Sequence, residues 1–305
     1  MRETVRRGLN LTEAANALHT SQPGVSKQIR ELENELGFDI FVRHGKRIAS
    51  LTEPGKAVLG IIERVLQEAE NLKRAAHDFI ERDTGSLTIA TTHTQARYSL
   101  PRVVGEFKRR YPKVHLSLLQ GNPPQVAEMA LSGMADIAIA TESLDQHAGL
   151  LALPGYTWNH CVVVPPKHPL LKLEALTLEA LARYPIITYD TAFAGRSHID
   201  AAFAARSIGV DVVLSAIDSD VIKTYVELGL GVGIIAAMAF DVRRDAHLRV
   251  LDCAHLFRSN TTRVAVKRGG LLRGYAYEFI EMFAPALSRK LIERALAGEG
   301  ELYEL

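Results

Sequence analysis

The sequence predicts an α/β protein in three parts: a winged helix-turn-helix at residues 1–52, a long linker helix at 53–83, and an α/β domain at 84–305. Two short helices and a basic hairpin predict the first part. An unbroken heptad pattern predicts the second, and alternating strand and helix patterns predict the third. The last part is long enough for two subdomains, one of about 84–155 plus 260–305 and one of about 156–259.

Composition is that of an ordinary soluble globular protein, with 47% hydrophobic and 23% charged residues in 305 positions. No apolar run reaches about 18 residues, so no membrane span is expected. The start, MRETVRRGLN, lacks the apolar stretch of a secretory signal. Cys161 and Cys253 form no paired motif, which favours a reducing cytoplasm over a disulfide framework.

Residues 11–37 predict two helices joined by a tight turn. Thr12 is the expected cap of the first helix. Ser21 is the expected cap of the second, Pro23 falls in its first turn, and Gly37 ends it. The second helix has an apolar stripe formed by Val25, Ile29, Leu32 and Leu36.

The other side of the second helix carries polar and basic residues of the kinds that contact base edges and phosphates. A hairpin that turns at Gly45 adds basic residues typical of a wing on the DNA backbone. Without the hairpin, periodicity leaves a helix-turn-helix and an ordinary helical hairpin equally open. The predicted DNA-binding residues are Ser21, Gln22, Pro23, Ser26, Lys27, Arg30, Arg43, Lys46 and Arg47.

The stretch TSQPGVSKQIRELENELGFDIFVR at 20–43 resembles the DNA-binding signature of LysR-type transcriptional regulators. The resemblance implies binding to double-stranded promoter DNA, assembly to a dimer or tetramer, and recruitment of RNA polymerase. The family usually has a complete helix before this pair, whereas only about ten residues precede Thr12 here. We therefore expect a shortened first helix or a start inside it.

The linker helix begins at the cap Thr52, with Pro54 in its first turn, and runs to about Arg82. Its apolar residues keep spacings of three and four, which is a heptad seam. Either a second copy of the chain or this chain's own domain would cover the seam, and we favour a homodimer because it suits paired DNA half-sites. The seam consists of Val58, Ile62, Val65, Ala69, Leu72, Ala76 and Phe79.

Short apolar strands then alternate with helices, which predicts mostly parallel sheets. The expected strands are Leu87–Ala90, Val114–Leu118, Asp136–Ala140, His160–Val164, Ile186–Tyr189, Val212–Ala216 and Val232–Ile235. The expected helices are Pro101–Arg110 and segments near 123–132, 177–183, 198–207 and 219–228.

Polar residues follow the first strand, where Thr92, Thr94 and Gln95 lead into a helix. Ligands of open α/β sheets bind beyond the carboxyl ends of strands, and helix N-termini favour anions. A second strand ends at Thr141, and AFAGRS opens a helix at 192–197. These residues predict an anion pocket, with ordinary turn and cap residues as the open alternative.

The stretch TTHTQARYSLP at 91–101 resembles the CysB and Cbl branch of LysR-type regulators, and the likeness extends over nearly the whole chain. The branch implies a ligand domain like the type-2 periplasmic binding proteins and control of sulfur assimilation and cysteine synthesis genes. Its effectors would be sulfate, thiosulfate, adenylyl sulfate or acetylserine, held by residues matching Thr92, Thr94, Gln95 and Thr141. A further family threonine falls at Ala194, and Arg196 is our hypothesis for a replacement donor.

Other classes of protein are less well supported. The glycines of GLGVG at 229–233 follow a helix and precede a strand, the reverse of a dinucleotide fingerprint, so a tight turn is expected. No metal-ligand spacing and no nucleophile–base set appear, so we expect neither an enzyme, a metal site nor a cofactor. A solute-binding protein without DNA-binding activity and a regulator of another small-molecule pathway stay open.

Overall fold

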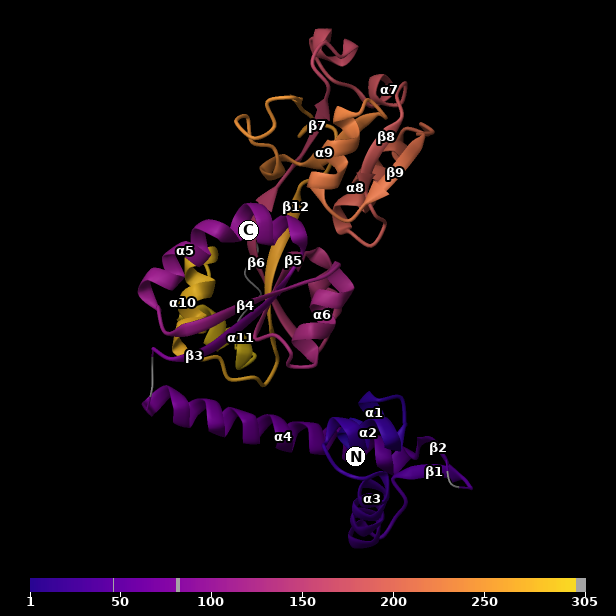
Figure 1. The fold of residues 1–305 in the computed structure, drawn as a ribbon, viewed down its shortest axis with the longest axis vertical. Coiled ribbons are helices and arrows are strands. Elements are labelled where there is room, and N and C mark those ends of the chain that lie inside the picture. The colour runs from indigo at the N-terminus through magenta and orange to yellow at the C-terminus, as the bar shows by residue number, and fades with distance from the viewer. Residues whose placement is uncertain (46, 81–82, 300–305) are drawn as a thin grey trace. The chain divides into compact units, whose positions relative to one another are not determined.

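The computed structural model describes residues 1–45, 47–80 and 83–299. Contacts divide the chain into two compact units, of which the first comprises Met1–Ala76 and Gly269–Leu271 and the second the remainder (Figure 1). Within the described ranges, no helix combines the length and the apolar character needed to cross a membrane.

The first unit begins with a one-turn helix, α1 (Arg2–Arg6), so the helix before the helix-turn-helix pair is short. Next comes α2 (Leu11–Ala17), whose cap is Asn10 rather than the predicted Thr12. The Asn10 side chain accepts from the backbone N–H of Thr12 and Glu13 at 2.9 and 3.2 Å. One amide oxygen thus satisfies two free donors of the first turn.

The second helix of the pair, α3 (Gln22–Leu36), begins and ends as predicted. The Ser21 hydroxyl accepts from the N–H of Gly24 at 3.2 Å, and Gly37 terminates the helix with φ +78°. The predicted apolar stripe is partly wrong, because Val25 and Ile29 are buried whereas Leu36 is 39% exposed.

A buried carboxylate, Glu33, takes the place of Leu36 in the interior of this unit. Its Oε1 accepts from the N–H of Ile40 and Phe41 at 2.9 and 3.2 Å, and its Oε2 accepts from Arg43 Nη2 at 2.7 Å. Helix α3 is thereby joined to the start of the wing hairpin. The burial of a charge is tolerated because all of these donors face it.

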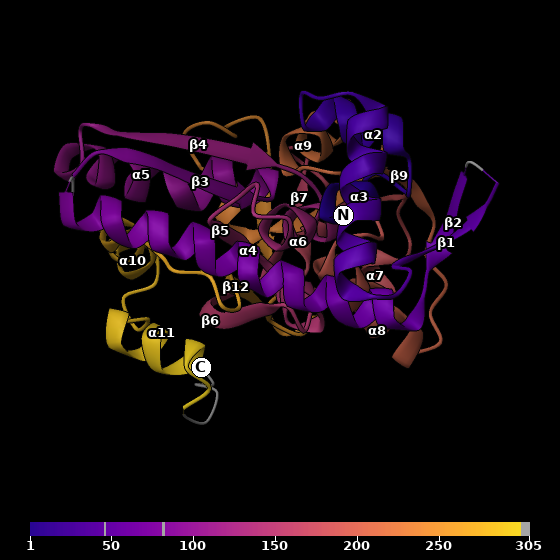
Figure 2. The ribbon, with the colours of Figure 1, turned by 90° about the horizontal axis from the view of Figure 1, so that it is seen from below.

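The wing is an antiparallel pair of β1 (Phe41–His44) and β2 (Arg47–Leu51) that turns at Gly45, with φ +62°. Helix α4 (Glu53–Ile80) follows without a break (Figure 2). The Thr52 hydroxyl caps it, accepting from the N–H of Gly55 at 2.9 Å.

Two five-stranded sheets make up the second unit. The first has the order β4-β3-β5-β12-β6 and the second β11-β7-β10-β8-β9. The strands of the first are β3 (Gly85–Thr91), β4 (Val114–Gln120), β5 (Ile137–Thr141), β6 (Leu150–Trp158) and β12 (Asn260–Lys267). The strands of the second are β7 (His160–Val164), β8 (Ile186–Tyr189), β9 (Val212–Ala216), β10 (Val232–Ala236) and β11 (Arg249–Asp252).

Helices cover both faces of each sheet. On the first sheet, α5 (Leu100–Arg110) and α10 (Gly274–Phe283) share one apolar core, and α6 (Pro123–Leu131) packs on the other face. On the second, α7 (Leu178–Leu181) and α8 (Ala194–Ala205) lie opposite α9 (Ser219–Glu227). Helix α11 (Arg289–Leu296) adds Ile292 to the first core.

All seven expected strands are present, and the prediction of mostly parallel sheets is confirmed in strand direction, because one strand of each sheet, β12 or β7, runs opposite to the other four. β3, β4 and β5 are parallel, as are β8, β9 and β10, whereas β12 and β6 in one sheet and β7 and β11 in the other pair antiparallel. The antiparallel strands adjoin the passages of the chain from one sheet to the other. β6, β11, β12, α10 and α11 were not among the predicted elements.

We expect Glu33→Ala to destabilise the helix-turn-helix by about 2–4 kcal/mol, because it leaves two buried backbone N–H groups and a guanidinium without their acceptor. Hydrogen exchange over residues 40–51 of the full chain would measure the loss. Glu35→Ala is the control, since Glu35 is exposed. Equal exchange in the two variants would contradict this account of the wing.

Candidate functional site

The predicted DNA-binding residues gather along α3 and the wing. A surface groove in the first unit is lined by Gln22, Pro23, Ser26, Lys27 and Arg30 of α3, together with Arg43 of the wing. Gln22, Lys27 and Arg30 are exposed, as a surface that reads DNA requires. Arg47 lies in an adjoining groove that also includes Gln22.

Some of these residues have other partners in the structure. Arg43 pairs with buried Glu33 at 2.7 Å, so it braces the wing as well as bordering the groove. The Ser21 hydroxyl is occupied as the cap of α3. Lys27 lies 3.7 Å from Glu31, an exposed pair worth little in water. Lys46 falls outside the described residues.

A small pocket lies in the second unit, where strands of both sheets end. The first sheet supplies Thr92, Thr94 and Gln95 after β3, Thr141 at the end of β5, and Trp158 at the end of β6. The second sheet contributes Tyr189 and Ala236, and the start of α8 contributes Phe193 and Gly195. Four of the six predicted effector residues are therefore brought together.

Among the residues whose side chains the structure describes, no lysine, arginine, aspartate or glutamate lines this pocket. Burial raises the pKa of Tyr189 to about 12, so its hydroxyl stays neutral. That hydroxyl accepts from the N–H of Ala236 at 2.8 Å and lies 2.6 Å from Ser219 Oγ. The lining thus offers hydroxyls, an amide and backbone dipoles without formal charge.

The N-terminus of α8 reaches the pocket at Gly195. Its N-cap, Phe193, makes no side-chain capping hydrogen bond. Uncapped N–H groups and the positive end of the helix dipole attract anions. Ala194 is the first residue of α8, and its side chain lies outside the described part.

Arg196 does not line the pocket. Its Nε donates to Asp200 at 2.8 Å, and its Nη1 donates to the carbonyl of Tyr189 at 2.9 Å and to Ser215 Oγ at 3.2 Å. The guanidinium therefore ties α8 to β8 and β9. The structure does not support our hypothesis that it replaces the missing threonine.

Polar groups without partners lie beside Gly195. A Cβ at this glycine would lie 2.9 Å from His160 Nε2 and 3.5 Å from Asn260 Oδ1. Both of these atoms, and Trp158 Nε1, are buried without a hydrogen-bond partner in the described structure. Burial, followed by the neighbouring His198, lowers the pKa of His160 to about 3, so His160 is neutral.

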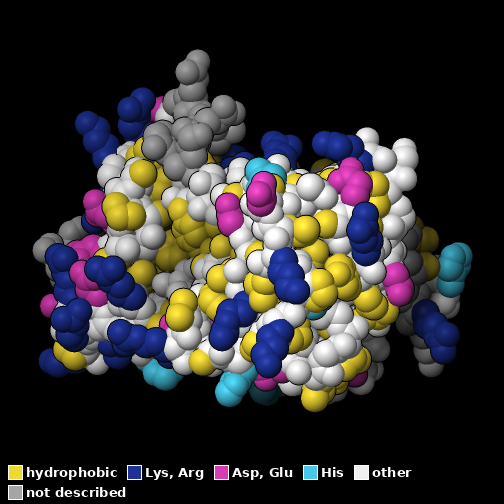
Figure 3. All heavy atoms as spheres, turned by 90° about the horizontal axis from the view of Figure 1, so that it is seen from above, with side chains coloured by type: hydrophobic (Ala, Val, Ile, Leu, Met, Phe, Trp, Pro, Cys, Tyr) yellow, Lys and Arg dark blue, Asp and Glu magenta, His cyan; other side chains and the backbone are white. Residues whose placement is uncertain are grey.

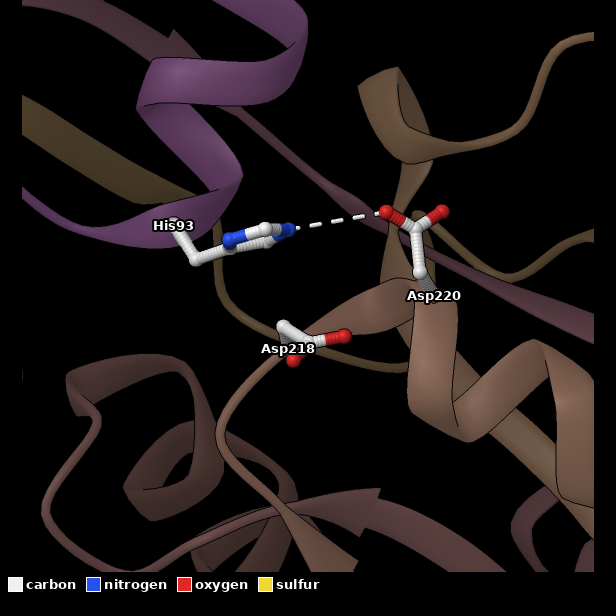
Figure 4. A group of neighbouring side chains, drawn as sticks. All are labelled: His93, Asp218 and Asp220. Atoms are coloured by element: carbon white, nitrogen blue, oxygen red, sulfur yellow. Dashed lines mark ion pairs between the residues drawn. The ribbon is translucent and has the colours of Figure 1, made fainter. Parts of the chain in front are cut away.

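His93, Asp218 and Asp220 cluster at the edge of the same region, with His93 Nε2 3.5 Å from Asp220 (Figure 4). Their ligand atoms lie within 4.8 Å of one another, as in a cation site. However, Asp220 already accepts from Tyr98 at 2.6 Å and from Arg97 at 3.1 Å. The Asp220 carboxylate is thus already engaged by Tyr98, Arg97 and the ammonium of Lys223. The cluster therefore joins the segment after β3 to α9 and does not offer a metal site.

The exposed face in Figure 3 mixes basic, acidic and hydrophobic side chains. Lysines and arginines are scattered over it and do not form one basic surface.

His160 should make stability depend on pH. Its pKa is about 6.5 in the unfolded chain and lower in the folded one, so its contribution is present above pH 6.5 and is lost as pH falls toward 3. From pH 7.5 to 5.5 we expect the wild type to lose about 1.4 kcal/mol more than His160→Gln does. Denaturant unfolding at both pH values would measure this difference, and identical pH slopes would refute it.

Comparison with known proteins agrees with this two-part description. The family model for the LysR substrate binding domain matches residues 81–288, and that for the bacterial regulatory helix-turn-helix protein of the lysR family matches residues 2–56.

Relatives of known name match over nearly the full length. The chain is 60% identical to the HTH-type transcriptional regulator CysB of Burkholderia cenocepacia over 305 residues, covering 100% of this chain and 97% of the relative. It is 50% identical to the regulator cbl of Escherichia coli K12, covering 99% and 95%. The solved cofactor-binding domain of the Cbl transcriptional regulator matches at 47% identity with a TM-score of 0.68, covering 70% of this chain and 93% of that one. The chain belongs to the LysR family of helix-turn-helix transcriptional regulators.

Proposed function

We propose that the protein controls transcription in response to a small anion bound in the pocket between the two sheets. The observation that carries this proposal is a neutral, donor-rich pocket onto which the uncapped N-terminus of α8 opens. Neutral donors and helix dipoles can hold an anion without burying a fixed counter-charge. Thr92, Thr94, Gln95 and Thr141 are the proposed ligand-binding side chains.

The proposed effectors are sulfate, thiosulfate, adenylyl sulfate or an acetylserine. The similarity to CysB and Cbl supports this class, and the genes under control would serve sulfur assimilation and cysteine synthesis. Ala194 lacks the hydroxyl that the resemblance led us to expect there. An effector of this protein would therefore depend more on Thr94 and on the backbone of α8.

On the DNA side, α3 would enter the major groove with Gln22, Ser26, Lys27 and Arg30 at base edges and phosphates. The wing residues would contact the backbone of the promoter duplex. A protein that makes these contacts would work in the cytoplasm, where the promoter DNA is.

Helix α4 supports self-association through its apolar seam. Val65 is 61% exposed and Leu72 is 72% exposed on this helix. Such residues at heptad spacing suit a partner helix of a second copy. The functional unit would be a dimer or tetramer on paired half-sites, and effector binding would shift it between arrangements that differ in recruiting RNA polymerase.

Calorimetry on the full chain with each of five compounds, sulfate, thiosulfate, adenylyl sulfate, O-acetylserine and N-acetylserine, tests the effector proposal. We expect one compound to bind, and Thr94→Ala to weaken it by at least about tenfold, because a hydrogen bond to a charged group is lost. Thr224→Ala on exposed α9 is the control. No binding of any compound, or equal binding by Thr94→Ala, would refute the proposed effector site.

Duplex binding over a range of salt concentrations tests the DNA proposal. Arg30→Ala should cost about 1–3 kcal/mol, while Arg109→Ala, a change on the second unit, should leave affinity unchanged. The wild-type affinity should fall linearly with the logarithm of salt. A solute-binding protein without DNA-binding activity would show no such dependence.

A further inference from the structure

Gln95 is held on both sides of its amide. Its Nε2 donates to Thr262 Oγ1 at 2.9 Å, and its Oε1 lies 2.5 Å from the hydroxyl of Tyr156. The side chain belongs to a residue only 2% exposed, in the π-helical turn Gln95–Ser99 that follows β3. Gln95 therefore lines the pocket with both polar atoms of its amide already hydrogen-bonded to protein side chains.

The two distances fix which way the amide faces. A separation of 2.5 Å suits an O–H···O hydrogen bond and is shorter than the usual N–H···O range, so the oxygen of Gln95 faces Tyr156. Tyr156 has one hydroxyl proton, and Gln95 accepts it. In the 2.7 Å contact between Ser99 Oγ and Tyr156, Ser99 must then be the donor.

This arrangement of hydrogen bonds leaves one N–H group of Gln95 to donate into the pocket. Nε2 has two N–H groups, and Thr262 is its single hydrogen-bond partner among the described residues. The second N–H remains for a ligand in the pocket that Gln95 lines. With its oxygen occupied, Gln95 can donate to a ligand but has little capacity to accept from one.

We propose that Tyr156 is a positioning residue that fixes the polarity of Gln95 and thereby makes this part of the pocket specific for hydrogen-bond acceptors. The inference rests on the proposed anion-binding function and assigns a second residue to its selectivity. Tyr156 is itself held, since its ring packs on Phe283 at 5.7 Å and its hydroxyl lies 3.7 Å from Met238 Sδ. Phenylalanine at this position would keep the ring packing and remove only the hydroxyl.

Without that hydroxyl, the Gln95 amide can turn over. The Thr262 hydroxyl can donate to the amide oxygen as well as accept from the nitrogen, so it does not fix the orientation alone. After such a rotation the amide oxygen would take the place of the N–H group that donates to the ligand. We expect Tyr156→Phe to lower the affinity for the anion by about tenfold.

A double-mutant cycle on the full chain tests this role. Tyr156→Phe, Gln95→Ala and the double variant are titrated by calorimetry with whichever of these five compounds binds the wild type most tightly. If Tyr156 acts through Gln95, its substitution costs about tenfold in the wild type and nothing further in the Gln95→Ala background. Tyr184→Phe is the matched control, because Tyr184 is a half-buried tyrosine that packs against His168 and the core of the second sheet, outside the pocket lining.

Ser99→Ala supplies a directional check. Ser99 donates to Tyr156 in this scheme, so its loss should change affinity far less than Tyr156→Phe does. The inference would be overturned if Tyr156→Phe lowered the affinity equally in the wild type and in the Gln95→Ala background. It would also be overturned if Tyr156→Phe alone left the affinity unchanged. Either result would leave the proposed anion pocket intact. Failure of every compound to bind the wild type would overturn both proposals.

Discussion

The pocket depends on the chain passing twice between the two sheets. One passage is Asn159, between β6 and β7, and the other is residues 253–259, between β11 and β12. These passages place the carboxyl ends of β3 and β5 opposite those of β8 and β10. Free backbone groups and turn residues occur where strands end, so the polar lining follows from the topology.

The described lining of the pocket contains no lysine, arginine, aspartate or glutamate, and this also suits a regulator. A buried cation that faced an anion would be left uncompensated whenever the pocket emptied, at a cost of several kcal/mol. Hydroxyls, an amide and helix N–H groups are uncharged, so leaving them without a ligand in the empty pocket costs much less free energy than leaving a buried charge. Both liganded and empty protein can thus be stable, which a two-state response requires.

Features set by neighbouring residues could be predicted from the sequence. The wing turn at Gly45, the caps at Ser21 and Thr52, and the strand ends carrying Thr92 and Thr94 all arise from local rules. Long-range contacts could not be predicted. Helical periodicity places Glu33 beside the apolar stripe, but its burial depends on donors from Ile40, Phe41 and the wing.

The same limit applies to the pocket. Trp158 and Tyr189 reach it from strands far apart in sequence, and β6 was absent from the predicted elements. Arg196 has the right sequence position at a helix start, yet Asp200 and the carbonyl of Tyr189 draw it away. Which face of the helix it occupies depends on β8 and β9, which the sequence around it does not specify.

Gly195 links the shape of the pocket to the path of the chain between the sheets. Any side chain there would press on His160, which begins β7 directly after one passage, and would approach Asn260, which begins β12 after the other. The pocket could therefore not change its size at Gly195 in evolution without a change in the two segments that connect the sheets. New ligand preferences in descendants of this protein would have to arise at the side of the pocket formed by Thr92, Thr94 and Thr141, away from Gly195.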